Sequence, residues 1–389
     1  MGKKVISISN FYDTFIKQIL KQDKGLDAEC LSNYSLSLLA NFSEKKDWII
    51  ISNLIDNIRN EFCIEDKRLN QKICGVEFCN PIGLAAGFDK NGLAANIWSD
   101  FGFGFSEIGT VTKYPQEGNP KPRLFRLAKE QAALNRMGFN NNGAEILLKN
   151  LIKQHIKEKE LRLNNCLGIN FGKSKITPLE QSTEDYIYSL KMLSPYCNYA
   201  AINISSPNTE GLRKLQDPIL LKELLQEIKK IPKCPPLFIK IAPDLNFQEI
   251  DEICQLINDE KIEGIIATNT SLNRLGLEDK VIEQTGQKLS NESGGLSGKP
   301  LRKKANNIIK HIHKVDKDII LIGVGGIDSP ETAWERISSG ASLIQIYTGW
   351  IYKGPSLVPE ILGGILKQLD IHKMSNIGEA IGSGMPWQN

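Results

Sequence analysis

Residues 166–204, CLGINFGKSKITPLEQSTEDYIYSLKMLSPYCNYAAINI, contain the pattern that repeats along most of the chain. The apolar runs CLGINF (166–171) and YAAINI (199–204) are nearly continuous and rich in β-branched or small residues, as strands buried on both faces are. The stretch 183–193 between them is amphipathic, and Ser182 gives it a typical helix start. The segment therefore predicts a strand, a helix and a second strand.

The same alternation begins near residue 79 and continues to about residue 369. Eight apolar runs predict strands: IGLAA (82–86), FSEIG (105–109), CLGINF (166–171), YAAINI (199–204), LFIKI (237–241), GIIAT (264–268), IILIGV (319–324) and LIQIY (343–347). Each is followed by a plausible helix, for example 142–157, 183–193, 218–230, 247–259, 300–315, 331–339 and 356–369. Eight such units predict an α/β fold, a (β/α)8 TIM barrel over residues 69–375. An open doubly wound sheet is the structural alternative.

Residues 1–68 do not follow this alternation and predict a small N-terminal helical extension. Its apolar residues form three stripes with helical spacing. These helices either pack on the barrel or turn an apolar face to a lipid surface. The segment RLNQKICGVEFCN then alternates like a hairpin that plugs the barrel bottom, and the glycine-rich residues 376–389 predict a flexible tail. The stripes are Phe11, Phe15, Ile19 and Leu20; Leu31, Leu38 and Leu39; and Trp48, Ile51, Ile55, Ile58 and Phe62.

Composition excludes several classes of protein. A net charge of +3 over 389 residues gives no sign of nucleic-acid binding. The eight cysteines include no C-x-x-C pair, so a zinc site or a disulfide framework is not expected, and a reducing compartment fits best. No run approaches the roughly 18 apolar residues of a membrane-spanning helix, and the start lacks signal- and transit-peptide features. The four histidines, His155, His311, His313 and His372, are predicted to be solvated surface residues.

Polar and glycine residues follow the predicted strands, where barrels of this type place their chemistry. GVGG after the seventh strand and YTG after the eighth coincide with the usual phosphate site. Lys240 lies inside LFIKI, where a buried lysine needs a partner or a function, although it could instead point outward between helices. A phosphate site, an interior cation and several asparagine amides suit flavin mononucleotide (FMN), because a reduced flavin is negative near N1. No G-x-G-x-x-G opens a helix, so a nicotinamide dinucleotide fits less well.

Ten motifs in order make the chain resemble the class 2, quinone-linked dihydroorotate dehydrogenases of pyrimidine synthesis. They span about residues 80 to 355, which is nearly the whole barrel. The N-terminal segment also fits that family's membrane-facing extension in length and character. The motifs are NPIGLAAGFDKNG, IGTVT, GNPKPRLFRL, NRMGFNN, NISSPNTEGLR, KIAPDL, IATNT, GGLSGKPL, IGVGGI and QIYTGWIYKGP.

The resemblance implies roles for residues that match these motifs. FMN contacts are implied for Ala86, Gly87, Lys90, Thr110, Asn170, Asn203, Lys240, Thr268, Gly298, Gly326, Tyr347 and Thr348. Contacts to dihydroorotate are implied for Lys90, Asn135, Arg136, Met137, Gly138, Phe139, Asn203, Asn208, Asn269 and Thr270. No metal is expected, since no histidine–carboxylate cluster falls at the strand ends.

The resemblance makes Ser206 the catalytic base, whereas related class 1 enzymes have a cysteine there. Dihydroorotate loses a hydride from C6 to the flavin and a proton from C5. Serine is a poor base at neutral pH, so Ser206 needs a link to a proton acceptor, such as a water near Thr209 and Phe139. The alternative for Ser206 is a hydroxyl that caps the turn before Pro207, a role that Ser205 suits better.

The resemblance also implies that electrons leave through a membrane quinone near Arg126 and Tyr347. The family's D-P-E-x-A-H pattern appears here as DKGLDAEC, which is expected to place Glu29 in the position of the histidine. The expected protein is a monomer, bound peripherally to the cytoplasmic side of a bacterial cell membrane. It is not expected to bind nucleic acid.

Three other functions stay open on the sequence. The first is another FMN barrel oxidoreductase that acts on a pyrimidine and uses a soluble acceptor, although Ser206 and the N-terminal extension argue against it. The second is a flavin-binding or scaffold protein without turnover. The third is a metal-dependent aldolase barrel, which the absence of a histidine–carboxylate cluster disfavours.

Overall fold

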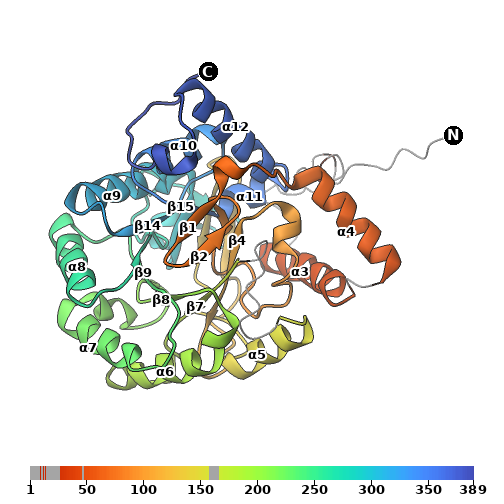
Figure 1. Cartoon of the computed structure of the whole chain (residues 1–389). Helices are drawn as coiled ribbons and strands as arrows, with labels where there is room; N and C mark the ends of the chain where they lie inside the picture. The colour runs from red at the N-terminus through yellow and green to blue at the C-terminus, as the bar shows by residue number, and fades with distance from the viewer. Residues whose placement is uncertain (1–8, 10–11, 13, 15–26, 46–47, 157–165) are drawn as a thin grey trace.

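Eight parallel strands close into a barrel, and helices surround it (Figure 1). The computed structural model describes residues 9, 12, 14, 27–45, 48–156 and 166–389. Neighbouring strands follow the order β3, β4, β7, β8, β9, β10, β14 and β15, and β15 pairs with β3. This closure confirms the barrel and excludes the open doubly wound sheet. The strands are β3 (Ile82–Leu84), β4 (Phe105–Val111), β7 (Cys166–Phe171), β8 (Tyr199–Asn203), β9 (Leu237–Ile241), β10 (Gly264–Ala267), β14 (Ile320–Val324) and β15 (Leu343–Ile346).

The predicted helices form at the predicted places. Two of them begin at capping boxes: Asn246 caps α8, and Ser329, directly before Pro330, caps α10. The first unit differs, because only the 3-10 turn η3 (Trp98–Phe101) separates β3 from β4. The helices are α5 (Ala144–Lys153), α6 (Ser182–Leu193), α7 (Pro218–Lys229), α8 (Phe247–Asp259), α9 (Arg302–Val315), α10 (Pro330–Ser338) and α12 (Leu357–Ile371).

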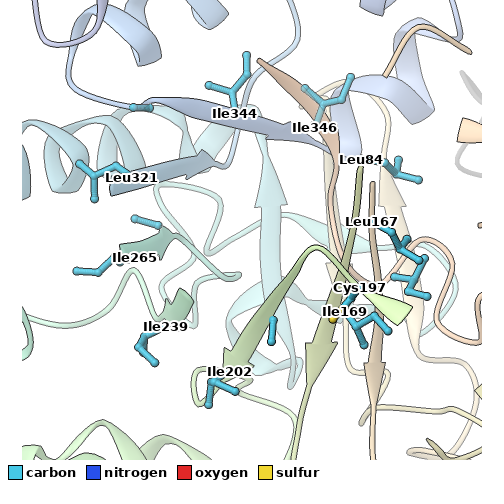
Figure 2. Close-up of a cluster of buried hydrophobic side chains, with 14 of the residues drawn as sticks. Leu84, Leu167, Ile169, Cys197, Ile202, Ile239, Ile265, Leu321, Ile344 and Ile346 are labelled. Atoms are coloured by element: carbon cyan, nitrogen blue, oxygen red, sulfur yellow. The ribbon is translucent and has the colours of Figure 1, made fainter. Parts of the chain in front are cut away.

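Alternation along the strands divides the core into two shells. Side chains such as Leu167, Ile202 and Ile239 lie in the larger cluster, which strands and surrounding helices share; Figure 2 shows part of it. The alternate positions, such as Tyr199 and Phe238, fill the barrel interior. This two-sided burial explains why the strands read as continuous apolar runs. It also means that each polar residue at an interior position faces the barrel axis.

Small sheets close the two ends of the barrel. The hairpin of β1 (Gln71–Ile73) and β2 (Val76–Phe78) forms in the segment predicted as a plug, and Val76 and Phe78 pack against the interior cluster. At the other end lies an antiparallel sheet of β5 (Leu124–Leu127), β6 (Ala132–Asn135) and β13 (Gly295–Gly298). Sequence reasoning did not predict this second sheet. A further short hairpin, β11 (Val281–Ile282) with β12 (Gln287–Lys288), and the short helix α11 (Thr348–Lys353) complete the barrel end.

Two helices precede the barrel in the described part of the N-terminal segment. They are α3 (Ala28–Glu44) and α4 (Ile49–Phe62), and both lie beside the barrel (Figure 1). α4 buries the end of its predicted stripe, where Phe62 stacks on Phe101 with ring centroids 5.8 Å apart. The predicted stripe from Phe11 to Leu20 lies outside the described residues. Among the described residues, no helix is both long and apolar enough to span a membrane.

The C-terminal residues 376–389 pack on α10 and α12. The Trp334 indole donates to the Met385 carbonyl at 2.9 Å, and Gln368 exchanges two hydrogen bonds with the backbone of Gln388. His372 stacks on Trp334 and contacts the Pro386 carbonyl. These contacts hold residues 376–389 against the barrel helices, although their glycine-rich composition predicts a flexible tail.

Candidate active site

A cavity of about 490 Å³ opens at the carboxyl end of the barrel strands. It extends from the barrel interior, beneath the β5–β6–β13 sheet, to the side of α3. All but two of the residues predicted to contact FMN, dihydroorotate or quinone line it; the two are Asn170 and Arg136. The structure therefore brings together residues that lie up to about 260 positions apart, such as Gly87 and Tyr347, whose hydroxyl donates to the Gly87 carbonyl at 3.3 Å.

The barrel interior below this cavity contains a fully buried carboxylate, Glu107 on β4. Its Oε1 accepts from Asn170 Nδ2 at 2.8 Å and from Lys240 Nζ at 3.3 Å. Its Oε2 accepts from Gln345 Nε2 at 2.7 Å and from the Tyr199 hydroxyl at 3.0 Å. Burial, followed by the charge of Glu107, raises the pKa of Tyr199 well above its ordinary value. Four donors thus satisfy one carboxylate and fix the ammonium group of Lys240 inside the barrel.

Sequence reasoning missed Glu107, Gln345 and Tyr199. The signal was present, since Glu107 interrupts the apolar run FSEIG at an interior position. Lys240, in contrast, was recognised as an interior cation, and the structure places it there with 5% exposure. The alternative that Lys240 points out between helices is wrong.

A second hydrogen-bonded group joins Asn170 to the cavity wall. Thr110 Oγ1 donates to Asn170 Oδ1 at 2.6 Å, and Asn203 Nδ2 lies 3.0 Å from both of these oxygen atoms. Asn170 itself lies below the cavity and supports the two residues that line it. Its side chain contacts Thr110, Asn203 and Glu107, and its contact to FMN stays a prediction.

Glycines open the end of the cavity near α11. Gly298 and Gly326 have φ values of +88° and +72°, which other residues adopt only with strain. A Cβ atom on Gly326 would lie 2.7 Å from the Arg302 Cα, so this position excludes larger residues on steric grounds as well. Beside them, Ser297 Oγ and Thr348 Oγ1 are 2.9 Å apart. Bare backbone and two hydroxyls form the type of surface that binds a phosphate group.

The stretch NISSPNTEGLR follows β8 and forms the opposite wall of the cavity. Ser206 is nearly buried, and its Oγ accepts from the Asn208 backbone N–H at 3.3 Å. Ser205 instead bonds to side chains: its Oγ donates to Asn203 Oδ1 at 3.2 Å and accepts from Asn269 Nδ2 at 3.0 Å. The turn-capping contact is therefore made by Ser206, whereas Ser205, the residue expected to cap the turn, links two asparagine side chains. Ser206 lines the cavity together with Asn208.

Thr209 and Phe139, the two residues named for the proton acceptor, lie in different parts of the site. Thr209 Oγ1 is buried and has no hydrogen-bond partner within the described part of the chain. Such an atom can bind a water molecule. Phe139, which lines the cavity, has a left-handed φ of +53°.

Lys90 lines the cavity on the side of the loop that follows β3. Burial lowers its pKa to about 8, which the charge of Glu29 partly opposes. No ion pair to Lys90 forms among the described residues, so its ammonium group is available to an anionic ligand in the cavity. The neighbouring Asp89 is fully buried and caps the following turn through Leu93 and Ala94 N–H groups.

The far end of the cavity is apolar and is formed by one face of α3. Its lining residues follow helical spacing: Ala28, Leu31, Ser32, Ser35, Leu38, Leu39 and Phe42. Arg126 from β5 and Tyr347 line the same cavity. Glu29, which is expected to take the position of the family's histidine, does not line this cavity, because its side chain points to Arg123.

Glu29 forms a buried ion pair with Arg123. Arg123 donates through Nε to Oε2 at 2.9 Å and through Nη2 to Oε1 at 2.6 Å. This hydrogen bonding lowers the pKa of Glu29. The pair fastens α3 to the loop before β5, and Ser32, one turn further along, takes the position that faces the cavity.

Arg136 also lies apart from the cavity. Its guanidinium pairs with Glu292, donates to the Pro122 carbonyl and packs over the Phe125 ring at 5.0 Å. The contact of Arg136 to dihydroorotate that the resemblance implies stays a prediction. Its neighbours Met137 and Gly138 do line the cavity.

None of the four histidines lines the cavity. The prediction that all four are solvated is nevertheless only partly right. His155 is exposed, whereas the other three are half-buried. His311 stacks on Phe247 and pairs with Asp251 at 2.6 Å, and burial lowers the pKa of His313. No cluster of His, Cys, Asp and Glu suited to a metal ion occurs in residues 27–45, 48–156 and 166–389.

Known proteins that this chain resembles in sequence and in structure carry the same family name. The profile of a family described as dihydroorotate dehydrogenase matches residues 68–369. A protein from Prochlorococcus marinus (strain MIT 9313) named dihydroorotate dehydrogenase (quinone) is 53% identical over 386 residues, covering 99% of this chain and 98% of its own. One of the same name from Trichormus variabilis is 50% identical over 350 residues, covering 90% and 91%. A crystal structure of the Eimeria tenella enzyme in complex with ferulenol has a TM-score of 0.80 at 32% identity, covering 95% and 98%.

Proposed function

The chain belongs to the dihydroorotate dehydrogenase family, and on this basis we propose that it is a quinone-dependent enzyme that oxidises dihydroorotate to orotate in pyrimidine biosynthesis. One observation carries the proposal: a single cavity joins the polar barrel mouth to the apolar face of α3. A polar substrate and an apolar electron acceptor can therefore both reach a cofactor bound between them.

The cofactor that fits the barrel mouth is FMN. The positive-φ glycines, with Thr348 and Ser297, form a cradle for its phosphate, and Lys240 supplies a fixed positive charge in the barrel interior. When bound, FMN supplies the hydride acceptor for substrate oxidation and the electron donor for quinone reduction. Lys240 would offset the negative charge of the reduced flavin, while Thr110 and Asn203, held by Asn170, would orient the ring through hydrogen bonds.

The chain's own residues account for substrate binding. The Lys90 ammonium group pairs with the substrate carboxylate, and side-chain amides such as those of Asn203, Asn208 and Asn269 bind the polar ring edge. Asn208 is itself fixed, because its Nδ2 donates to the Asn135 carbonyl at 3.2 Å and to the Asn135 side chain at 3.3 Å. These contacts would hold the ring with C5 toward Ser206. As the Ser206 Oγ accepts the C5 proton, the proton of its own hydroxyl would pass to a water bound at Thr209, so that the serine ends the step neutral.

The apolar end of the cavity would bind the quinone. Around it, five large apolar side chains on or beside α3 and α4 are exposed, with Ile49 and Ile50 the most exposed at 80% and 83%. An apolar surface of this kind suits the interface of a lipid bilayer. Through this surface the protein would bind peripherally to a membrane, and quinone would enter between the helices. The monomeric state and the cytoplasmic side of a bacterial cell membrane are proposed from the family resemblance alone. The exposed residues are Tyr34, Leu38, Trp48, Ile49 and Ile50.

The protonation state of Lys90 should set the pH dependence of substrate binding. The lysine is charged below its pKa of about 8 and neutral above it. Affinity for dihydroorotate should therefore be constant below this pH and fall by up to about tenfold per pH unit above it. Rapid-mixing measurement of the dissociation constant across this range checks the expectation. A Lys90→Met variant should bind weakly at every pH, and a wild-type constant that does not change up to pH 10 would contradict the assignment.

Blocking the α3 side of the cavity should separate the two half-reactions. Leu39→Trp inserts bulk where the quinone would pass, so reoxidation of reduced flavin by a short-chain ubiquinone should slow by about tenfold, a cost of about 1.4 kcal/mol. Reduction of the flavin by dihydroorotate should not change. The matched control is Asn33→Trp, which places the same ring on an exposed position of α3.

This experiment also tests the alternative of a soluble acceptor. Fumarate and NAD are offered in place of the quinone to both variants and to the wild-type enzyme. Rapid reoxidation by either compound, insensitive to Leu39→Trp, would exclude the quinone route. Equal slowing of both half-reactions would mean that the tryptophan perturbs the fold rather than the passage.

A further inference from the structure

Arg213, the last residue of NISSPNTEGLR, joins three successive loops at the mouth of the barrel. Its Nε donates to the Ser205 carbonyl at 3.0 Å, and its Nη2 donates to the Thr270 carbonyl at 3.1 Å. Its Nη1 lies 2.9 Å from Asp244 Oδ2. These three partners belong to the loops after β8, β10 and β9, respectively. Arg213 itself does not line the cavity.

Asp244 is in turn fixed by neighbours other than Arg213. Its Oδ1 accepts from Ser271 Oγ at 2.6 Å and from Lys304 Nζ at 3.0 Å. Its Oδ2 also accepts from the Leu272 N–H at 2.9 Å. Burial would raise the pKa of Asp244, but these hydrogen bonds outweigh it and lower the pKa. The carboxylate is therefore a charged and rigid anchor for the guanidinium.

The two carbonyls that Arg213 holds belong to two neighbouring loops of the substrate site. Ser205 directly precedes Ser206, the proposed base, and Thr270 directly follows Asn269, whose Nδ2 donates to Ser205 Oγ at 3.0 Å. The guanidinium joins the backbones of these two loops on the side away from the cavity, beside this side-chain contact. Only a planar fork with several donors can bind two carbonyls and a carboxylate at once, and lysine lacks this geometry.

We propose that Arg213, anchored by Asp244, is a positioning residue that fixes the Ser206 loop against the Asn269–Thr270 loop for proton removal from C5. The inference rests on the proposed function. It assigns Arg213 no contact with substrate, flavin or quinone. Its effect reaches the reaction through the backbone of Ser205 and Thr270.

The test uses the purified holoenzyme and an Arg213→Lys variant, with Arg68→Lys as the control. Arg68 also pairs with two aspartates, Asp66 and Asp370, but lies beside the hairpin that plugs the opposite end of the barrel. Arg213→Lys should slow flavin reduction by dihydroorotate by about 10- to 100-fold, the usual effect of a small misplacement. In Arg213→Lys, the rate of reoxidation by ubiquinone and the flavin content should stay at wild-type values. In Arg68→Lys, these two quantities and the rate of flavin reduction should all stay at wild-type values. Asp244→Asn should reproduce the defect more weakly.

Dihydroorotate deuterated at C5 gives a kinetic isotope effect on flavin reduction, which a purely structural role of Arg213 would leave unchanged. Proton transfer should limit the variant more than the wild-type enzyme, so the isotope effect on flavin reduction should rise in Arg213→Lys. If the flavin of Arg213→Lys is reduced at the wild-type rate, the inference about Arg213 is wrong. The same holds if this variant loses its flavin and both half-reactions together. Neither result would contradict the proposed function. A wild-type enzyme that dihydroorotate does not reduce would overturn the proposed function and this inference with it.

Discussion

Replacing Ser206 with alanine is expected to slow the reduction of bound flavin by dihydroorotate by about 10²–10⁴-fold, the usual contribution of a positioned general base. Ser206 lines the cavity, and the Asn208 N–H orients its oxygen at 3.3 Å. Alanine removes the only hydroxyl of this pair of serines that faces the cavity. Anaerobic stopped-flow measurement of flavin absorbance gives the rate directly. Reoxidation by quinone should not change, because it involves no proton from C5.

Two further variants separate this role from the local fold. Ser205→Ala removes hydrogen bonds to Asn203 and Asn269 and should therefore cost much less than Ser206→Ala. Ser206→Cys keeps a group that can accept a proton and should reduce faster than the alanine variant. An alanine variant that is reduced at the wild-type rate would show that another group removes the proton.

Lys240→Met is expected to be the most damaging single substitution in the barrel interior. It leaves Glu107 with neutral donors only, in a site with no solvent exposure. Removing one partner of a buried ion pair typically costs about 3–5 kcal/mol, so the free energy of unfolding should fall by about this amount. Urea unfolding followed by circular dichroism measures it, and flavin absorbance reports the expected loss of cofactor.

A double variant tests the cause of this loss. Adding Glu107→Gln to Lys240→Met removes the unpaired carboxylate and should recover part of the lost stability. Lys288→Met is the surface control: Lys288 also pairs with an acidic residue, Asp279 at 2.7 Å, but is exposed and should show no measurable change. A double variant less stable than Lys240→Met would mean that Glu107 contributes through hydrogen bonds and packing rather than through its charge.

The barrel could be predicted from the sequence because parallel strands buried on both faces read as continuous apolar runs. The β5–β6–β13 sheet was missed, since its strands are only four residues long, carry polar and glycine residues, and include the pairing of β6 with β13 across more than a hundred positions. The absent first helix has a similar cause: the Asp89 carboxylate caps an irregular turn that only the folded chain defines.

The candidate site was predicted largely from motifs, which give positions along the chain but not side-chain directions. Glu29 was assigned the position of a motif histidine, and the structure turns its side chain to Arg123, whereas Ala28, Leu31 and Ser32 line the cavity. Arg136 belongs to a motif that reaches the cavity, and its guanidinium pairs with Glu292. Glu107 was overlooked because a carboxylate within an apolar run becomes meaningful only when the interior residues of neighbouring strands are known.

The central claim is that one cavity serves both dihydroorotate and quinone. The most direct test is an anaerobic double-mixing experiment in which the purified flavoprotein meets dihydroorotate first and a short-chain ubiquinone second. We expect the flavin absorbance to be bleached by dihydroorotate and then to recover fully when the ubiquinone is added. Bleaching without recovery would contradict the role of the α3 side of the cavity, and absence of bleaching with flavin bound would contradict the proposed function itself.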